Sequence, residues 1–171
     1  MKKREFMKKI YIAGPDVFEK NSIELGKSLV RLCSKYGFEG LYPLDNLVNF
    51  SQEKHKIAWD IFVANKQMIE DSDIVIANLN SFRGKEADSG TVWECGFAYG
   101  LGKKVYGYMS ELSDYVDTFS NDEKVKDGDN FLDNQNRIIE DFNHPINLML
   151  AYSVAIVEGN FETVLKKIDE L

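Results

Sequence analysis

The sequence is poor in cysteine and histidine. Its 171 residues include two cysteines, Cys33 and Cys95, and two histidines, His55 and His144. These four residues are scattered along the chain and form no Cys-x-x-Cys or Cys/His spacing. The sequence therefore predicts neither a structural zinc site nor the disulfide scaffold of a small secreted protein. A reducing cytoplasm is the expected location, and we expect no metal.

Long apolar runs are also absent, and positive charge is not in excess. The basic start, residues 1–9, leads into only a short apolar run, which is too short for the apolar part of a signal peptide or for a membrane span. The net charge of −7 disfavours binding to nucleic acid. We therefore expect a cytoplasmic protein that binds neither nucleic acid nor a membrane.

The negative charge is concentrated in one segment. Between Glu111 and Asp141 there are ten acidic and three basic residues, whereas the rest of the chain holds eighteen of each. Acid-rich segments with few apolar residues usually remain solvated, because they cannot bury enough surface to offset the entropy of folding. We expect residues 1–171 to form a single domain with an acidic, loop-like excursion at about 111–143, which proteases should cut first between Ser113 and Asn136.

Apolar runs typical of buried strands alternate with amphipathic, helix-like stretches along the rest of the chain. The predicted strands are 9–15, 38–42, 73–79, 104–108 and 154–157, and the main predicted helices are 19–36, 55–71, 88–102 and 161–171. This alternation predicts an α/β fold with right-handed crossovers. We expect a flavodoxin-like, three-layer fold whose five-stranded parallel sheet has the order 2-1-3-4-5. Ligands of such sheets bind outside the carboxyl ends of strands one and three, where the strand order reverses.

The stretch Asp88–Gly102 is the most informative of these helices. Asp88 or Ser89 can cap its start by accepting a backbone N–H. Gly96 and Gly100 lie inside it, each costing about 1 kcal/mol relative to alanine, which predicts that the helix backbone packs closely on the sheet. Glu94 is expected to project from this packed helix at the carboxyl edge of a strand.

Asp88 and Glu94 are predicted to lie beside Tyr11 of strand one in that crevice. Two carboxylates in different environments are what glycosyl transfer requires, because one attacks the anomeric carbon while the other manages the proton of the leaving group. A tyrosine hydroxyl beside the nucleophile would orient it. A divalent metal site is the alternative, but the pair lacks Asp-rich neighbours. The turn at Gly14 and Pro15 matches neither a dinucleotide-binding nor a P-loop pattern.

Four stretches together resemble the nucleoside 2-deoxyribosyltransferase family, in order over about residues 8–160. These stretches are residues 10–18, 73–84, 88–98 and 147–149. The resemblance implies a flavodoxin-like homo-oligomer that needs no cofactor. It also implies exchange of the base of 2′-deoxynucleosides, so that deoxynucleosides and free nucleobases would be the substrates.

The resemblance also assigns roles to residues. Glu94 corresponds to the nucleophile, which forms a covalent 2-deoxyribosyl-enzyme and gives net retention of configuration. Asp88 corresponds to the carboxylate that contacts the base, and Tyr11 to the tyrosine that holds the nucleophile. Asn147 and Met149 correspond to a segment that a neighbouring subunit supplies to the active site.

Base recognition is the least defined part of the resemblance. Phe18 corresponds to the aromatic residue beside the base, and Gly14 belongs to the same substrate-binding turn. Asn65 stands where some members have aspartate, and Leu47 where some have glutamine. The sequence therefore leaves the preference between purines and pyrimidines open.

Two other functions remain as alternatives. An N-glycosidase acting on 2′-deoxynucleoside 5′-monophosphates would need donors for a phosphate dianion. The segment near the crevice offers Arg83 and Lys85, but also the carboxylates Glu86 and Asp88. A non-catalytic nucleotide-binding or flavin-binding module is the second alternative, and it leaves the pairing of Asp88 with Glu94 unexplained.

Overall fold

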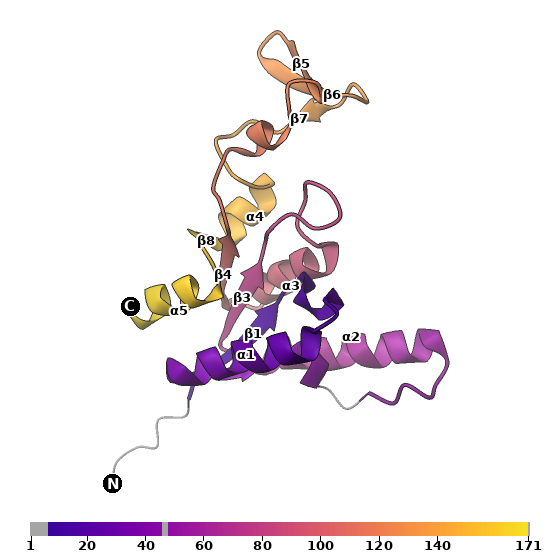
Figure 1. Cartoon of the computed structure of the whole chain (residues 1–171), viewed down its shortest axis with the longest axis vertical. Helices are drawn as coiled ribbons and strands as arrows, with labels where there is room; N and C mark the ends of the chain where they lie inside the picture. Colours follow the sequence, from indigo (N-terminus) through magenta and orange to yellow (C-terminus); the bar gives the residue numbers. More distant parts are fainter. Residues whose placement is uncertain (1–6, 46–47, 171) are drawn as a thin grey trace.

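The computed structural model describes residues 7–45 and 48–170, and its centre is a five-stranded parallel sheet (Figure 1). The strand order is β2-β1-β3-β4-β8, so the predicted order of five strands is confirmed. The strands are β1 (Lys9–Ala13), β2 (Glu39–Leu41), β3 (Ile74–Asn78), β4 (Lys104–Met109) and β8 (Ala155–Glu158). Leu47, one of the predicted base-recognition positions, lies outside the described residues.

Helices cover both faces of the sheet and give the predicted three layers. They are η1 (Pro15–Phe18), α1 (Ser22–Lys35), η2 (Pro43–Asp45), α2 (Lys54–Asp71), α3 (Ser89–Gly100), α4 (Leu148–Ser153) and α5 (Phe161–Asp169). Buried residues of α1 and α5 pack on one face, and those of α2, α3 and α4 pack on the other.

The central strands are apolar except at their ends, because both of their faces are buried. In β1, Ile10 and Ile12 join the core beneath α1 and α5. Tyr11 and Ala13 join the core beneath α2 and α3, since successive side chains of a strand point to opposite faces. Tyr11 is therefore a core residue whose side chain points toward α3.

The helix predicted over residues 19–36 begins later, at Ser22. The turn after β1 forms η1, which Pro15 can open because proline needs no hydrogen bond at its nitrogen there. The backbone is extended at Glu19, with φ −71° and ψ 148°, and this ends η1 before α1 starts.

The acidic segment 111–143 contains regular structure, so the prediction of a loop was wrong, whereas residues 120–130 are mostly exposed, as expected of a solvated segment. It holds η3 (Tyr115–Thr118) and an antiparallel sheet of β5 (Lys124–Asp127), β6 (Asn130–Asp133) and β7 (Ile138–Ile139). This small sheet projects beyond the main sheet in Figure 1. Val116 and Ile139 are buried. Bonds from Arg137 hold the pKa of Asp133 at about 2. The prediction used only the number of acidic residues, which does not reveal these contacts.

The two glycines of α3 also differ from expectation. The buried face of this helix consists of Thr91, Cys95 and Ala98. Gly96 and Gly100 are exposed, and a β carbon added at either position would have no atom within 4 Å. The prediction that these glycines pack closely on the sheet was therefore wrong, because neither of them belongs to the buried face of α3. Among the described residues, no helix combines the length and the apolar character needed to cross a membrane.

Candidate active site

A hollow of about 350 Å³ opens beside the carboxyl end of β1, near the point where the strand order reverses between β1 and β3. This is where open α/β sheets bind ligands. Its lining residues are Gly14, Val17, Phe18, Pro43, Leu44, Val48, Phe50, Ile61, Asn65, Asp88, Gly90, Thr91 and Glu94. Five of the predicted site residues thus lie around one hollow. The apolar residues of the η2 region and of α2 that complete its wall were not predicted, because they resemble ordinary core residues in the sequence.

Glu94 and Tyr11 form a hydrogen-bonded pair at this hollow. The Tyr11 hydroxyl donates to Glu94 Oε1 at 2.6 Å, and Tyr11 itself is fully buried. Burial raises the pKa of Glu94 to about 7; the bond from Tyr11 lowers it, and the nearby charge of Asp88 raises it. Burial, with the charge of Glu94, also raises the pKa of Tyr11. Tyr11 therefore remains a protonated donor, whereas Glu94 ionises near neutral pH.

Asp88 caps α3, as the sequence predicted. Its Oδ2 accepts bonds from the Thr91 backbone N–H at 2.9 Å and from the Thr91 hydroxyl at 3.1 Å. These bonds satisfy one of the backbone donors left free at a helix start. Within the described part of the chain, Oδ1 of Asp88 has no hydrogen-bond partner. The residue therefore combines a structural oxygen with an oxygen that is available at the hollow.

A polar network that the sequence analysis missed lies beneath Gly14. The Asn78 amide donates to Asp16 at 3.2 Å, Asn80 donates to Asn78 Oδ1 at 2.7 Å, and Ser110 donates to Asn80 at 2.9 Å. A β carbon at Gly14 would lie 2.5 Å from Asp16 and 2.9 Å from Asn78, so only glycine fits. Asn78, the last residue of β3, and Asn80, two residues later, were the sequence signal for this network.

Phe18 forms an aromatic wall of the hollow. Its ring is stacked on Phe82, with centroids 5.4 Å apart and planes 17° apart. The guanidinium carbon of Arg83 lies 5.1 Å from the Phe18 centroid. A flat apolar ring at the edge of a hollow suits contact with a planar ligand such as a nucleobase.

Asn147 and Met149 do not line this hollow. They lie at a separate hollow between α3 and α4, which also includes Gly96 and Tyr99. Asn147 caps α4, since its Oδ1 accepts from the Met149 backbone N–H at 3.0 Å. Its amide donates to Glu140 Oε1 at 2.7 Å.

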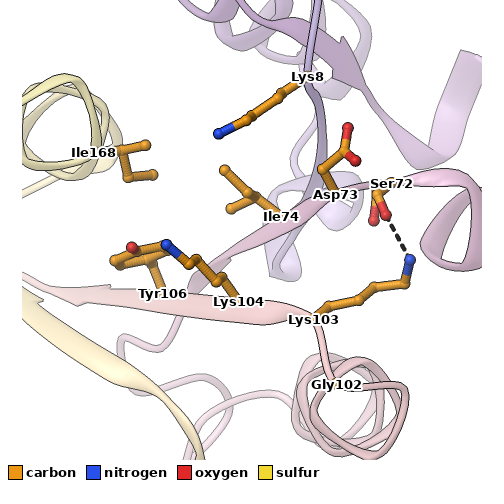
Figure 2. A pocket seen from close by; sticks show the side chains of 9 residues that line it. All are labelled: Lys8, Ser72, Asp73, Ile74, Gly102, Lys103, Lys104, Tyr106 and Ile168. Atoms are coloured by element: carbon orange, nitrogen blue, oxygen red, sulfur yellow. Dashed lines mark hydrogen bonds between the residues drawn. The ribbon is translucent and has the colours of Figure 1, made fainter. Parts of the chain in front are cut away.

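A further hollow, of about 400 Å³, lies at the amino ends of β1, β3 and β4 (Figure 2). It is lined by Lys8, Ser72, Asp73, Ile74, Gly102, Lys103, Lys104, Tyr106 and Ile168. Lys103 is already bonded there to the backbone carbonyls of Glu70 and Ser72, and Asp73 accepts from the Lys9 backbone N–H at 2.7 Å. Asp73 is the single carboxylate among these nine lining residues. Throughout residues 7–45 and 48–170, no three His, Cys, Asp or Glu residues are grouped to hold a metal ion.

Comparison with known proteins finds a matching family and similar structures. Residues 10–149 match the family described as nucleoside 2-deoxyribosyltransferase. A 2-desoxiribosyltransferase from Leishmania mexicana has a similar structure, with 30% sequence identity and a TM-score of 0.75, over 95% of this chain and 97% of that one. A CMP N-glycosidase from Clostridium botulinum shares the fold, with 16% identity and a TM-score of 0.50, over 96% of this chain and 100% of that one.

One curated protein is also similar, an uncharacterized protein from Schizosaccharomyces pombe. It is 28% identical over 105 residues, which cover 60% of this chain and 50% of that protein. The match thus spans about half the length of this relative. The family match, in contrast, covers most of the present chain, including the Tyr11, Asp88 and Glu94 positions. The chain belongs to the nucleoside 2-deoxyribosyltransferase family.

Proposed function

We propose that the protein exchanges the base of 2′-deoxynucleosides through a covalent 2-deoxyribosyl ester on Glu94. The observation that carries this proposal is the position of Glu94: a partly buried carboxylate at a ligand-sized hollow, bonded by Tyr11 and close to a second carboxylate. Two carboxylates in different environments can divide the roles of nucleophile and proton donor between them.

In the first step, ionised Glu94 attacks C1′ of the deoxynucleoside. The C1′–N bond breaks, its electron pair goes to the base, and a C1′–O ester forms. Glu94 Oε1 accepts the bond from Tyr11, which leaves Oε2 as the attacking oxygen. Tyr11 holds the carboxylate in place and, by lowering its pKa, increases the fraction that is ionised.

Asp88 manages the base. Its Oδ1, the oxygen not used in capping α3, gives a proton to the departing base, so that the base leaves as a neutral molecule and Asp88 is left as a carboxylate. In the second step a different base attacks C1′ and gives its ring N–H proton to Asp88, while the ester bond breaks and Glu94 is restored as a carboxylate. Two inversions at C1′ give net retention, and no cofactor takes part.

The rest of the hollow suits a planar base. Phe18 offers a ring for stacking, and Gly14 allows the backbone of the turn to approach the ligand. The Asn65 side chain has both a donor and an acceptor for a base edge. As a neutral amide it differs from the aspartate of some relatives, so it is a position at which base preference is set.

The proposed assembly is a homo-oligomer with shared active sites. Asn147 and Met149 lie away from the hollow of their own chain, on a surface where Met149, Tyr152 and Tyr99 are exposed. A two-fold interface would bring this segment to the hollow of a second chain. The amide of Asn147 can serve both as the α4 cap and as a contact for the sugar 5′-hydroxyl, because it has two N–H donors and two lone pairs.

A 2′-deoxynucleoside 5′-monophosphate N-glycosidase is the second candidate, favoured by the guanidinium of Arg83 beside Phe18 at the hollow. Lys85, the other cation in this segment, is bonded to Thr118 and Glu123, so a single Arg side chain would have to bind the phosphate. The neighbour that is a CMP N-glycosidase shares only the fold with this chain.

The two candidates are separated by incubating the purified protein with thymidine plus adenine, and with deoxynucleoside monophosphates alone, and resolving the products by chromatography. Deoxyadenosine and thymine from the first mixture support transfer. Free base and deoxyribose 5-phosphate from the second, without exchange in the first, support the hydrolase. Glu94→Gln protein is the control in both mixtures. No turnover in either would contradict both enzymes and favour a binding module.

A further inference from the structure

The support for Phe18 comes from a distant part of the chain. Phe18 ends the four-residue η1, and 57% of its surface is exposed. Its ring stacks on Phe82 from the loop that follows β3. An exposed ring on so short a helix has few contacts to fix its orientation. The stacking on Phe82 therefore orients the Phe18 ring at the hollow.

Arg83 completes the stack. Its guanidinium carbon lies 4.6 Å from the Phe82 centroid and 5.1 Å from the Phe18 centroid, close enough for cation–π attraction to both rings. The Arg83 backbone has φ 53°, a conformation that residues other than glycine seldom adopt. Such a conformation persists only where the surrounding contacts enforce it.

Those contacts begin within the loop and continue into the folded segment 111–143. The Phe82 N–H donates to the Glu86 carbonyl at 2.8 Å. Lys85 donates to the Thr118 carbonyl and to Glu123 Oε2, both at 2.8 Å, and its ammonium lies 4.8 Å from the Phe119 ring centroid.

A further hydrogen bond joins loop 80–87 to segment 111–143, from the Tyr115 hydroxyl to the Glu86 carboxylate. Lys85 and Glu86 are therefore both bonded to segment 111–143. None of the residues that line the hollow belongs to 111–143, so this segment reaches the hollow through the loop and not by covering it.

We propose that segment 111–143 acts as a support for loop 80–87, with Phe82, Arg83 and Lys85 as positioning residues that hold the Phe18 ring against the bound base. The inference rests on the proposed function for its consequence: the support sets the affinity for the base and not the chemistry at Glu94. The interaction of Phe18 with the two side chains of the loop is independent of that function.

The first test needs no turnover. Phe18 is replaced by 4-fluorophenylalanine, and its ¹⁹F resonance is recorded in the otherwise unchanged protein and in Phe82→Leu, Lys85→Met and Glu123→Gln proteins. The matched control is Lys124→Met, which removes an ammonium that bonds to Val116 within 111–143 but not to the loop. Thermal unfolding is recorded for every protein, and only folded variants are compared.

The expected result is that the resonance moves toward that of a free fluorophenylalanine peptide in Phe82→Leu and Lys85→Met, less so in Glu123→Gln, and stays in place in Lys124→Met. An unchanged resonance in Lys85→Met would overturn the support by 111–143. An equal displacement in Lys124→Met would also overturn it, because the effect would then reflect general loosening.

The second test measures exchange. KM for the donor nucleoside should rise roughly tenfold in Phe82→Leu and Lys85→Met, as expected for weakened stacking on a base, whereas kcat should change less than about twofold. A fall in kcat with unchanged KM would contradict positioning of the base. A wild-type protein that performs no exchange would refute the proposed function instead, and the ¹⁹F measurement would still decide whether the loop and 111–143 position Phe18.

Discussion

The hydroxyl of Tyr11 and the carboxylate of Glu94 are 2.6 Å apart, although 83 positions separate the residues in the sequence. The pair joins the first strand of the sheet to the third α-helix. Tyr11 is held in place by β1, which pairs with both β2 and β3, so the orientation of Glu94 depends on the centre of the sheet. This relationship leads to the first three of the following predictions.

Glu94→Gln should retain the fold and lose base exchange by roughly three orders of magnitude or more, because an amide cannot form the glycosyl ester. Wild-type protein incubated with a donor but no acceptor should gain one 2-deoxyribosyl unit on the peptide that contains Glu94, detectable by mass spectrometry. Near-normal exchange by Glu94→Gln would refute the covalent mechanism.

Tyr11→Phe should shift the pH dependence of exchange. The pKa of about 7 for Glu94 already includes the lowering by the bond from Tyr11, so the pKa should rise further when the hydroxyl is removed. Because the nucleophile must be ionised, the acid limb of the profile should move to higher pH, by about one unit for a hydrogen bond to a charged group. A uniform fall in rate with an unmoved limb would show that Tyr11 affects only geometry.

Glu94→Gln should also change how stability depends on pH. The folded-state pKa of about 7 lies above the ordinary value of 4.5, so the folded protein binds more protons than the unfolded chain between these values. Wild-type stability should therefore fall as pH rises from about 4.5 to 7, by on the order of 3 kcal/mol from this group. Glu94→Gln lacks this loss.

The measurement is thermal unfolding of both proteins at pH 5 and pH 8. The gain of Glu94→Gln over wild type should be larger at pH 8 by several degrees. Glu158→Gln, which changes an exposed glutamate of β8, is the matched control and should show no such difference. Equal gains for Glu94→Gln at both pH values would mean that the charge of Glu94 is well solvated.

Asp88 can be divided into its two roles by substitution. Asp88→Asn and Asp88→Ser keep an oxygen that caps α3, whereas Asp88→Ala should lose about 1 kcal/mol of stability with the cap. Exchange should fall in all three, and most strongly for donors whose bases are poor leaving groups, since these need the proton most. Rates measured with ordinary and activated bases test this; equal losses for both would leave Asp88 as a cap only.

The shared site is tested by mixing inactive proteins. Glu94→Gln and Asn147→Ala oligomers should each be nearly inactive. Unfolded together and refolded as hybrids, they should regain exchange, because some sites then combine an intact Glu94 with an intact Asn147 of another chain. Hybrids verified by mass spectrometry that stay inactive would place the whole site within one chain. Exchange by Asn147→Ala alone would show that its amide serves only α4.

Most of the fold, and part of the residues that line the hollow, follow from local patterns in the sequence. The apolar strands, the Asp88 cap and the position of Glu94 at a strand's carboxyl edge are all local signals, and the strand order followed from the alternation of elements. Segment 111–143 was misjudged because its order depends on cross-strand pairing and on contacts with loop 80–87, which composition does not reveal. The exposure of Gly96 depends on which side of α3 faces the sheet. The sequence of a helix rich in small residues does not predict which side that is.

The Phe18, Phe82 and Arg83 stack shows the same limit. Each residue is unremarkable in its own stretch, and only the folded chain brings η1 and the loop after β3 together. The resemblance to relatives indicated Phe18 but not the residues behind it. Such supporting contacts become visible only once the positions of both loops are known.

Segment 111–143 lies between two strands that are neighbours in the sheet, because β4 pairs with β8. The chain between Met109 and Ala155 can therefore be treated as one loop whose two ends are fixed by the sheet. The entropy lost on closing a loop grows only with the logarithm of its length, at about 0.6 kcal/mol for each doubling. Insertions and deletions at this point should thus cost the sheet little, and such length changes would be a route by which related chains acquire or lose control over the base without rebuilding the parallel sheet.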